Sequence, residues 1–271
     1  MKNVFRNKIN SQSITVLIVV VLLGVFLGFS AIAQSATRHK NGELINSNGT
    51  IYLIQNDQRW GFRTIEEFIS HGYKFDMVLS SNSSDLELPY GGEMRVRAGT
   101  MAQDINDGST LYFVYNTEAR PIPNQALIFL LGFEGRKYLS VDISDYTVGE
   151  PIDFGFAFDT LQPGTLVNDN GTIFIVTSNG RAGFPSEAVF RSYGYNFESV
   201  FPINTATLNL PVLPDLGYRD GTLVNDKGTI FLISGNKKYG FKFWEEFVGR
   251  GYKLSAVING DTSGLLESVL E

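Results

Sequence analysis

Basic and aromatic side chains recur in this chain just before a repeated Gly-Phe step. They are Arg59, Trp60, Arg120, Arg181, Lys238 and Tyr239. Aromatic rings can stack on sugar rings, and guanidinium groups can hold a carboxylate. If these side chains face outward, they form a periodic binding stripe, and the sequence predicts them as ligand-binding residues. The competing interpretation is an edge strand that charge protects from pairing with another strand.

Two pairs of adjacent glutamates, Glu66-Glu67 and Glu245-Glu246, could in principle serve glycoside hydrolysis. Both pairs fall in the first turn of an expected helix, where acidic side chains interact favourably with the helix dipole. A hydrolase would instead need acids from the connectors, such as Asp85, Asp142 or Asp215, to converge in a cleft between repeats. We therefore predict no catalytic residue and keep a carboxylate hydrolase as an alternative.

The chain has no cysteine and two histidines, which bounds its chemistry. Disulfide scaffolds, thiolate zinc sites, thiol catalysis and lipidation at a lipobox cysteine are excluded. We expect His39 to be solvated and His71 to lie at the surface or to cap a helix end. The Asn/Asp-rich turns lack the ligand series of a calcium loop, and no phosphate-binding glycine loop is present. Neither a metal nor a cofactor is predicted.

Composition and charge limit the partners. The 271 residues are 43% hydrophobic and 18% charged, which excludes a long disordered, charged chain. The net charge of −6 has the wrong sign for a nucleic-acid binder. No nucleic-acid partner is expected.

Residues 1–33 differ in kind from the rest. Lys2, Arg6 and Lys8 precede an uncharged apolar run over residues 14–33, which ends in the A-x-A cleavage pattern Ala31-Ile32-Ala33. This pattern predicts a signal peptide, but twenty helical residues also reach across a bilayer core of ~30 Å, so an uncleaved signal anchor is the rival. Both interpretations place the residues after Ala33 outside the cytoplasmic membrane. The anchor would make the membrane a partner through residues 14–33.

The remaining chain repeats itself four times. The turn glycines Gly49, Gly108, Gly171 and Gly228 lie 59, 63 and 57 residues apart, and such self-similarity is the signature of repeat architectures. We assign residues 34–40 as a linker, followed by repeat 1 (41–91), repeat 2 (97–160), repeat 3 (162–214) and repeat 4 (219–271). Proline- and serine-containing connectors join them, and their apolar residues should pack along neighbouring repeats. Either a linear array or a closed, propeller-like arrangement would satisfy this pattern.

Each repeat has the same internal order. A short strand, a polar turn that ends in glycine, and an apolar strand covered on both faces lead to a second turn and a third strand. A helix of about two turns follows, with caps at Thr64 (a capping box with Glu67), Asn124 and Ser186 but none at Phe243.

The two ends of this unit are also repeated. Each helix ends at a left-handed glycine, at Gly72, Gly132, Gly194 and Gly251. An aromatic residue and a closing strand come next. Apolar residues of the helices, such as Ile65, Phe68 and Ile69, or Trp244, Phe247 and Val248, should face the core. The predicted fold class is therefore α+β, with four tandem repeats of three to four short strands and one short helix, preceded by an N-terminal hydrophobic helix.

The pattern G-T-[LI]…G-T-I-[YF]-[LI]-[IV]…[RK]-x-G-F…F-x-x-x-G-Y resembles tandem repeats of secreted and surface-attached bacterial proteins. It covers about residues 41–258, and the second copy departs from it with Pro121 and Ile128. The resemblance implies no catalytic residues. The expected function is an exported, non-catalytic repeat protein of the bacterial cell surface that binds a glycan, cell-wall material or another surface protein. A purely structural, self-assembling envelope protein is the alternative.

Overall fold

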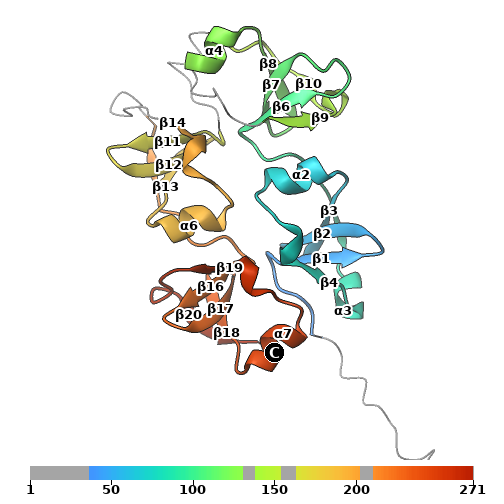
Figure 1. The fold of residues 1–271 in the computed structure, drawn as a ribbon, viewed down its shortest axis with the longest axis vertical. Coiled ribbons are helices and arrows are strands. Elements are labelled where there is room, and N and C mark those ends of the chain that lie inside the picture. Colours follow the sequence, from blue (N-terminus) through green and yellow to red (C-terminus); the bar gives the residue numbers. More distant parts are fainter. Residues whose placement is uncertain (1–36, 131–137, 154–162, 202–209, 271) are drawn as a thin grey trace, which may run out of the picture. The chain divides into compact units, whose positions relative to one another are not determined.

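The structure is a computed structural model that describes residues 37–130, 138–153, 163–201 and 210–270 (Figure 1). Arg38–Glu271 form one compact unit, and all contacts given below lie within it. In the described ranges no helix is long and apolar enough to cross a bilayer. The predicted helix at residues 14–33 lies outside the described residues.

Four separate five-stranded sheets follow one another along the chain, and each belongs to one repeat. The first contains β1 (Leu44–Ser47), β2 (Thr50–Gln55), β3 (Gln58–Phe62), β4 (Val78–Ser80) and β5 (Tyr90–Met94). The second contains β6 (Thr100–Asp104), β7 (Leu111–Tyr115), β8 (Glu118–Ile122), β9 (Leu139–Val141) and β10 (Thr147–Val148). The third contains β11 (Leu166–Asp169), β12 (Thr172–Thr177), β13 (Gly180–Gly183), β14 (Val200–Phe201) and β15 (Val212–Leu213). The fourth contains β16 (Leu223–Asp226), β17 (Thr229–Ser234), β18 (Lys237–Gly240), β19 (Val257–Asn259) and β20 (Leu266–Val269).

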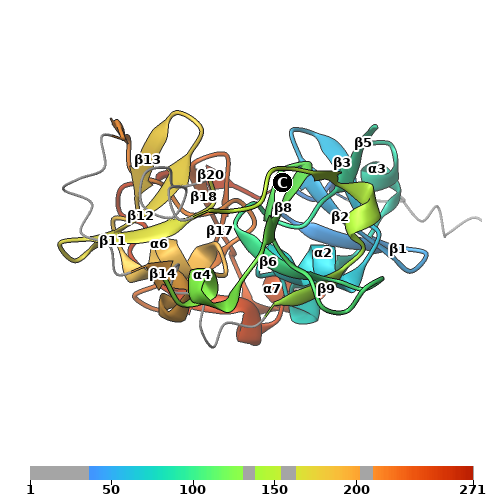
Figure 2. The ribbon, with the colours of Figure 1, turned by 90° about the horizontal axis from the view of Figure 1, so that it is seen from above.

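All four sheets share one strand order. In the first it is β4-β1-β2-β3-β5: the middle three strands are antiparallel, and the two outer strands pair in parallel with β1 and β3. The second strand of each repeat is central, as the apolar character of both its faces predicts. Figure 2 shows these sheets from a second direction.

Two-residue turns set the register of the first two strands in repeats 1, 3 and 4. Ser47 pairs with Thr50 across Asn48-Gly49, and both turn residues have positive φ, as this tight hairpin requires. The Asn46 side chain accepts a hydrogen bond from the Gly49 amide at 3.0 Å. Asn168 and Asn225 repeat this contact in the third and fourth repeats. The four turn glycines all have positive φ, which confirms their predicted role.

The predicted α+β class with three to four strands per repeat was wrong. The fold is mostly β, and each mixed sheet has a fifth strand, which comes from the connector in repeats 1 to 3 and from the C-terminal segment in repeat 4. In the first repeat this strand is β5, which contains Gly91 and Gly92 and has no alternating pattern. In the third it is only Val212–Leu213. Such strands form by long-range parallel pairing with β3 or β13, so local sequence gives no signal for them.

Short helices follow the third strand of each repeat. They are α2 (Ile65–Ser70), α4 (Gln125–Leu130), α6 (Glu187–Ser192) and α7 (Trp244–Gly249). The connector of repeat 1 adds α3 (Ser83–Leu86), and 3-10 helices occur at η1 (Phe75–Met77), η2 (Ile143–Asp145), η3 (Phe197–Ser199) and η5 (Leu254–Ala256). The capping box of Thr64 and Glu67 is confirmed, as are the caps at Asn124 and Ser186 and the uncapped Phe243.

The helices bury a narrower face than predicted. Phe68 and Phe247 are buried, but Ile65, Ile69, Trp244 and Val248 are exposed. A two-turn helix on a small sheet has room to cover only one row of side chains. The buried phenylalanine packs edge-on against the one that ends the third strand, at 5.4 Å for Phe62 and Phe68.

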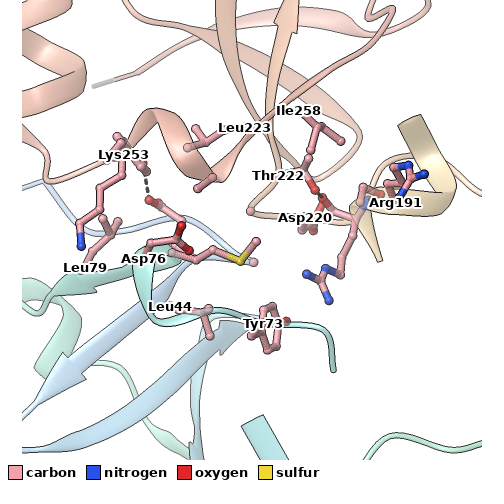
Figure 3. Close-up of a pocket in the computed structure, with 18 residues that line it drawn as sticks. Leu44, Tyr73, Asp76, Leu79, Arg191, Asp220, Thr222, Leu223, Lys253 and Ile258 are labelled. Atoms are coloured by element: carbon pink, nitrogen blue, oxygen red, sulfur yellow. Dashed lines mark hydrogen bonds between the residues drawn. The ribbon is translucent and has the colours of Figure 1, made fainter. Parts of the chain in front are cut away.

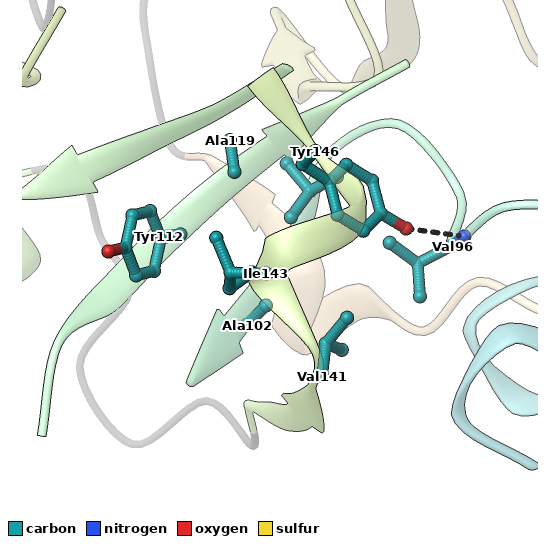
Figure 4. Close-up of a cluster of buried hydrophobic side chains, with 8 residues drawn as sticks. Val96, Ala102, Tyr112, Ala119, Val141, Ile143 and Tyr146 are labelled. Carbon is teal, nitrogen blue, oxygen red and sulfur yellow. Dashed lines mark hydrogen bonds between the residues drawn. The ribbon is translucent and has the colours of Figure 1, made fainter. Parts of the chain in front are cut away.

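Each sheet has apolar clusters on both faces. In repeat 1, Leu53 and Phe68 lie in the cluster on the helix side, and Ile45, Ile54 and Leu88 form the cluster on the other face. Figure 4 shows the corresponding second cluster of repeat 2, into which Val96 inserts from the preceding connector. The Val96 amide donates to the hydroxyl of Tyr146 at 3.3 Å. Connectors therefore pack as part of the repeats that they join.

Candidate functional site

Three of the predicted binding residues occupy one equivalent position. Arg59 pairs with Ile54, Arg181 with Val176 and Lys238 with Ile233 in the strand register. Each cation lies over an aromatic ring of the neighbouring strand in its own sheet, at 5.3 Å for Arg59 and Tyr52, 4.6 Å for Arg181 and Phe174, and 4.8 Å for Lys238 and Phe231. These three basic residues thus each have a cation–π contact inside their own repeat, in repeats 1, 3 and 4.

The other three predicted residues lie one position further along the strand and so belong to the opposite face. Trp60 and Tyr239 are half-buried and pack against the helix-side clusters of repeats 1 and 4. Arg120 occupies this second position in repeat 2, because it pairs with Phe113 as Trp60 pairs with Leu53. Its Nε donates to the Glu150 carbonyl at 2.8 Å. The six residues are distributed over four sheets and two faces, and the structure does not gather them.

The carboxylates considered for hydrolysis make local contacts. Glu67 is buried and accepts from the amide and guanidinium of Arg63. Glu66 is half-buried and Glu245 exposed, and Glu246 forms an ion pair with Arg250 at 3.3 Å. Asp142 accepts from the Ser144 amide at the start of η2, and Asp215 lies beside Gly183 of the third sheet. Asp85 is fully buried in repeat 1. Each therefore acts in its own repeat.

The strongest concentration of buried polar groups joins repeat 1 to repeat 4. Residues 38–43, which we call the N-terminal strap, lie against repeat 4. The Ser234 hydroxyl donates to the Asn41 carbonyl at 2.8 Å, and the Lys40 ammonium lies 4.5 Å from the ring of Tyr239. The Tyr252 hydroxyl donates to the buried Glu43 carboxylate in a short hydrogen bond.

A second buried pair fixes the strap to its own repeat. Asp85 accepts from the His39 amide at 2.9 Å, and one of its oxygens lies 2.7 Å from His39 Nδ1. The expectation that His39 is solvated was therefore wrong, because the connector helix α3 places Asp85 beside it. No local pattern relates residues 46 positions apart.

Burial and neighbouring charges perturb the titration of these groups. Burial raises the pKa of Glu43 against the opposing effects of His39 and Tyr252, and burial together with Glu43 raises the pKa of Tyr252. Burial alone would lower the pKa of His39, but the hydrogen bond with Asp85 and the charge of Glu43 outweigh it and raise that pKa. The Tyr252 hydroxyl thus stays protonated at neutral pH and remains the donor to Glu43.

A cavity of about 50 Å³ adjoins this contact (Figure 3). Tyr73, Asp76, Arg219 and Tyr252 are among its lining residues. The Oδ1 atom of Asp76 is buried and has no hydrogen-bond partner among the described residues. This space has room for ordered water molecules.

Two equivalent arginines join repeats 1 and 3. Arg97 donates to the carbonyl of Tyr193 at 2.5 Å, and Arg219 donates to the carbonyl of His71 at 2.6 Å. Their guanidinium groups stack on Tyr195 at 4.0 Å and on Tyr73 at 4.2 Å. No described ion pair gives either arginine a carboxylate. Burial lowers the pKa values of both arginines, and the charge of Arg219 lowers that of Arg97 further.

His71 lies between these arginines, at the end of α2. Its Nε2 is 2.8 Å from the Arg95 carbonyl. Burial and the two arginines lower the pKa of His71 to about 4. His71 is the C-cap residue of α2, as predicted, but its buried ring contacts the Arg95 carbonyl and not a terminal carbonyl of the helix. The ring is neutral at pH 7.

Sequence reasoning missed Glu43, Arg97, Arg219 and Tyr252 as junction residues. A signal for the arginines exists: Arg-x-Gly-Thr opens repeats 2 and 4, at Arg97 and Arg219, but not repeats 1 and 3. This alternation matches the structure, in which repeats 1 and 3 receive equivalent contacts. Among the described residues, no group of three or more acidic or histidine side chains is placed to hold a metal ion.

Comparisons with known proteins give no family. No protein-family model matches the chain, and no curated protein matches it significantly. Solved structures show a distant similarity to this chain, among them three that are titled as parts of ESX complexes. A chain of "the periplasmic assembly from the ESX-5 inner membrane complex" is 13% identical with a TM-score of 0.19, covering 86% of this chain and 67% of that one. A chain of "an intact ESX-5 inner membrane complex" is 9% identical with a TM-score of 0.18, covering 95% and 85%.

The third is a chain of the "EccB3 dimer from the ESX-3 core complex". It is 11% identical with a TM-score of 0.18, and the match covers 84% of this chain and 97% of that one. TM-scores of this size do not establish a shared fold.

Proposed function

We propose that this chain is an exported, non-catalytic protein of the bacterial cell envelope, held at the outer face of the cytoplasmic membrane by residues 14–33. Its four repeats would serve as a scaffold that binds a protein partner. The observation that carries the proposal is the use of buried polar groups. Tyr252 contacts Glu43 and Asp85 contacts His39, and these contacts join the strap to repeats 4 and 1. The buried polar groups therefore hold the fold together.

The N-terminal sequence supports export and anchoring. Lys2, Arg6 and Lys8 precede the apolar run and would stay in the cytoplasm. The run of twenty residues exceeds the usual signal-peptide core of about 7–15 residues. It matches the length that spans a bilayer core, about twenty residues. Retention as an anchor is the form that this length favours.

Side-chain placement favours a protein partner over a glycan. Trp60 and Tyr239 pack into the helix-side clusters, so their rings are not free platforms for sugars. Leu266 is 73% exposed and Val269 61% exposed on β20, an outer strand of the fourth sheet. Exposed apolar side chains on an edge strand suit the addition of a strand from another protein.

Single-cysteine mapping tests export. Because the chain has no cysteine, each introduced cysteine is the only thiol of the protein that can be labelled. The full chain carrying Thr117→Cys, in an exposed hairpin turn, should react with a membrane-impermeant maleimide on cells stripped of any outer barrier. Asn3→Cys should react only after lysis. Labelling of Thr117→Cys only after lysis would contradict export. Release of a chain that begins at Gln34 would contradict the anchor.

Photo-crosslinking tests the partner. A photoreactive residue at Leu266 of the full chain should give a discrete adduct with a different protein in intact cells. An adduct with a second copy would instead favour the self-assembling envelope protein. An adduct that a muramidase removes would favour a cell-wall ligand.

A further inference from the structure

Repeat 4 begins its helix differently from repeats 1 and 3. Thr64 and Ser186 cap α2 and α6 with side-chain hydrogen bonds, but Phe243 stands at this position before α7 and makes none. A residue that breaks a local rule without a local gain often serves a function elsewhere. The Phe243 side chain is 68% exposed, so it does not gain by packing in the core.

Several exposed side chains around α7 are apolar, and they stand beside the exposed charged residues Lys242, Glu245 and Lys253. Trp244 is 53%, Val248 50% and Leu254 58% exposed, and Trp244 and Val248 are helical neighbours four residues apart. We call Phe243, Trp244, Val248 and Leu254 the repeat 4 apolar face. In repeat 3 the equivalent helix positions of Trp244 and Val248 are Glu187 and Arg191, which form an ion pair at 2.6 Å. Repeat 1 also exposes apolar side chains at the equivalent positions, Ile65, Ile69 and Phe75. Repeat 4 differs from it by the exposed aromatic rings of Phe243 and Trp244, where repeat 1 has Thr64 and Ile65.

The N-terminal strap brings the start of the exported region to repeat 4. Lys40 lies over Tyr239, and Glu43 accepts from Tyr252, which follows α7 in the chain. Only Gln34–Thr37 separate the apolar run, which ends at Ala33, from Arg38. At about 3.5 Å per residue, the five steps from Ala33 to Arg38 span at most ~18 Å. An anchor in the bilayer would hold Arg38, at the start of the strap, within this reach of the membrane, and the strap contacts repeat 4.

We infer that the repeat 4 apolar face docks on the lipid bilayer at the outer surface of the membrane, an inference that rests on the proposed anchor. Tryptophan and phenylalanine are suited to the interface between headgroups and acyl chains. The exposed Lys242 and Lys253 stand beside Phe243 and Leu254 in the sequence, where their ammonium groups can reach lipid phosphates. Because the exported region is acidic overall, apolar contact and the tether supply the attraction and charge alone does not.

The test uses the full chain in vesicles of phosphatidylethanolamine and phosphatidylglycerol, with and without lipids brominated near the headgroup. The chain has two tryptophans, so Trp60→Phe leaves Trp244 as the single reporter. Insertion of the ring at the headgroup boundary should cost Trp244 about half of its emission in brominated vesicles. If Trp60→Phe impairs folding, the chain that keeps Trp60, measured with and without Trp244→Phe, gives the Trp244 signal by difference.

Repeat 3 provides the matched control. In a chain with Trp60→Phe, Trp244→Phe and Glu187→Trp, the reporter occupies the equivalent exposed helix position and should keep its emission. Val248→Glu with Leu254→Glu should remove most of the quenching of Trp244. Vesicle flotation of the same samples reports the anchor separately.

The outcomes separate this inference from the proposed function. Flotation with quenched Trp244 supports both. Flotation with unquenched Trp244 overturns the docking while the anchor stands. Failure to float overturns the anchor and the docking together. A Trp244 emission that shifts to the blue with the protein-to-lipid ratio, without quenching, shows that a second copy covers the face and overturns the inference.

Discussion

Gly72 and Gly194, which end the helices α2 and α6, meet backbone to backbone across the contact between repeats 1 and 3. A Cβ atom built on Gly72 would lie 2.5 Å from the Cα of Gly194. Both glycines have φ of +73°, so each serves two purposes. It ends its helix in the left-handed conformation, and it lets two backbones approach more closely than any side chain allows.

Gly194→Ala should therefore destabilise the protein more than the same substitution at a glycine that also has positive φ but where a Cβ would contact no other atom. Gly171→Ala is the matched control, because Gly171 also has positive φ and has nothing within 4 Å of a built Cβ. We expect a cost of about 1–2 kcal/mol for Gly171→Ala and about 1–3 kcal/mol more for Gly194→Ala, where the contact must open. Urea unfolding of both variants measures the difference. Equal costs would show that the close approach contributes nothing.

The two histidines should titrate on opposite sides of their ordinary pKa of 6.5. Their ring signals in an NMR titration should show His71 near a pKa of about 4 and His39 above 6.5. Since the chain has only these two, His39→Gln assigns the spectrum. A pKa near 6.5 for His71 would mean that water reaches its ring and that the two arginines lie further away.

His71 also makes stability depend on pH. Its pKa is lower in the folded protein than in the unfolded chain, so its contribution is full above pH 6.5 and is lost as the pH falls towards 4. With 1.36 kcal/mol per pH unit, the loss amounts to about 3 kcal/mol. Unfolding free energies of the wild type and His71→Asn, compared at pH 7 and pH 4.5, isolate this term. The gap between them should narrow or reverse at the lower pH, and a constant gap would contradict the assignment.

How far the sequence predicts this fold depends on the range of the interaction. The Asn48-Gly49 turn and the Thr64–Glu67 capping box were predictable because each is decided within four residues. The strand Tyr90–Met94 was not, since it is defined by parallel pairing with β3, about thirty residues earlier. The residues of the candidate site were predictable to the same extent, according to the range of their contacts. Arg59 was visible in the repeat pattern, whereas Glu43 gains its role only when Tyr252, 209 residues away, is brought to it.

Tyr252→Phe should weaken the contact between repeats 1 and 4. It removes the hydroxyl that donates to the buried Glu43 and leaves that carboxyl group with one donor fewer, at a cost of about 1–3 kcal/mol. Hydrogen exchange should then show faster opening of the strap and of β17, with the third sheet unaffected. Glu43→Gln keeps an acceptor for Tyr252 and should cost less. The opposite order of the two variants would show that the contact does not depend on this hydrogen bond.

Trp60→Ala should lower the stability of the protein, and any loss of ligand binding should follow from that loss of stability. Its ring packs in the helix-side cluster of repeat 1 and covers Gly92, where a built Cβ would lie 3.1 Å from the ring. Removal of a large half-buried ring should cost about 2–4 kcal/mol. Tyr239→Ala should do the same in repeat 4. Retained stability together with lost binding to cell-wall material would restore the outward binding stripe as the better account of both residues.

Phe243→Ser should stabilise the isolated exported region, although it removes a large apolar side chain. Phe243 has the extended backbone of an N-cap, with φ of −142° and ψ of 154°, and no side-chain hydrogen bond. Serine at the equivalent position of repeat 3 accepts from the Val189 amide at 3.2 Å. The new cap for the Glu246 amide should contribute about 1 kcal/mol, and little is lost because the ring is exposed. Thermal unfolding of Phe243→Ser and of Phe243→Ala, which offers no cap, measures the gain. If Phe243→Ser were no more stable than Phe243→Ala, the ring itself would be what supports α7.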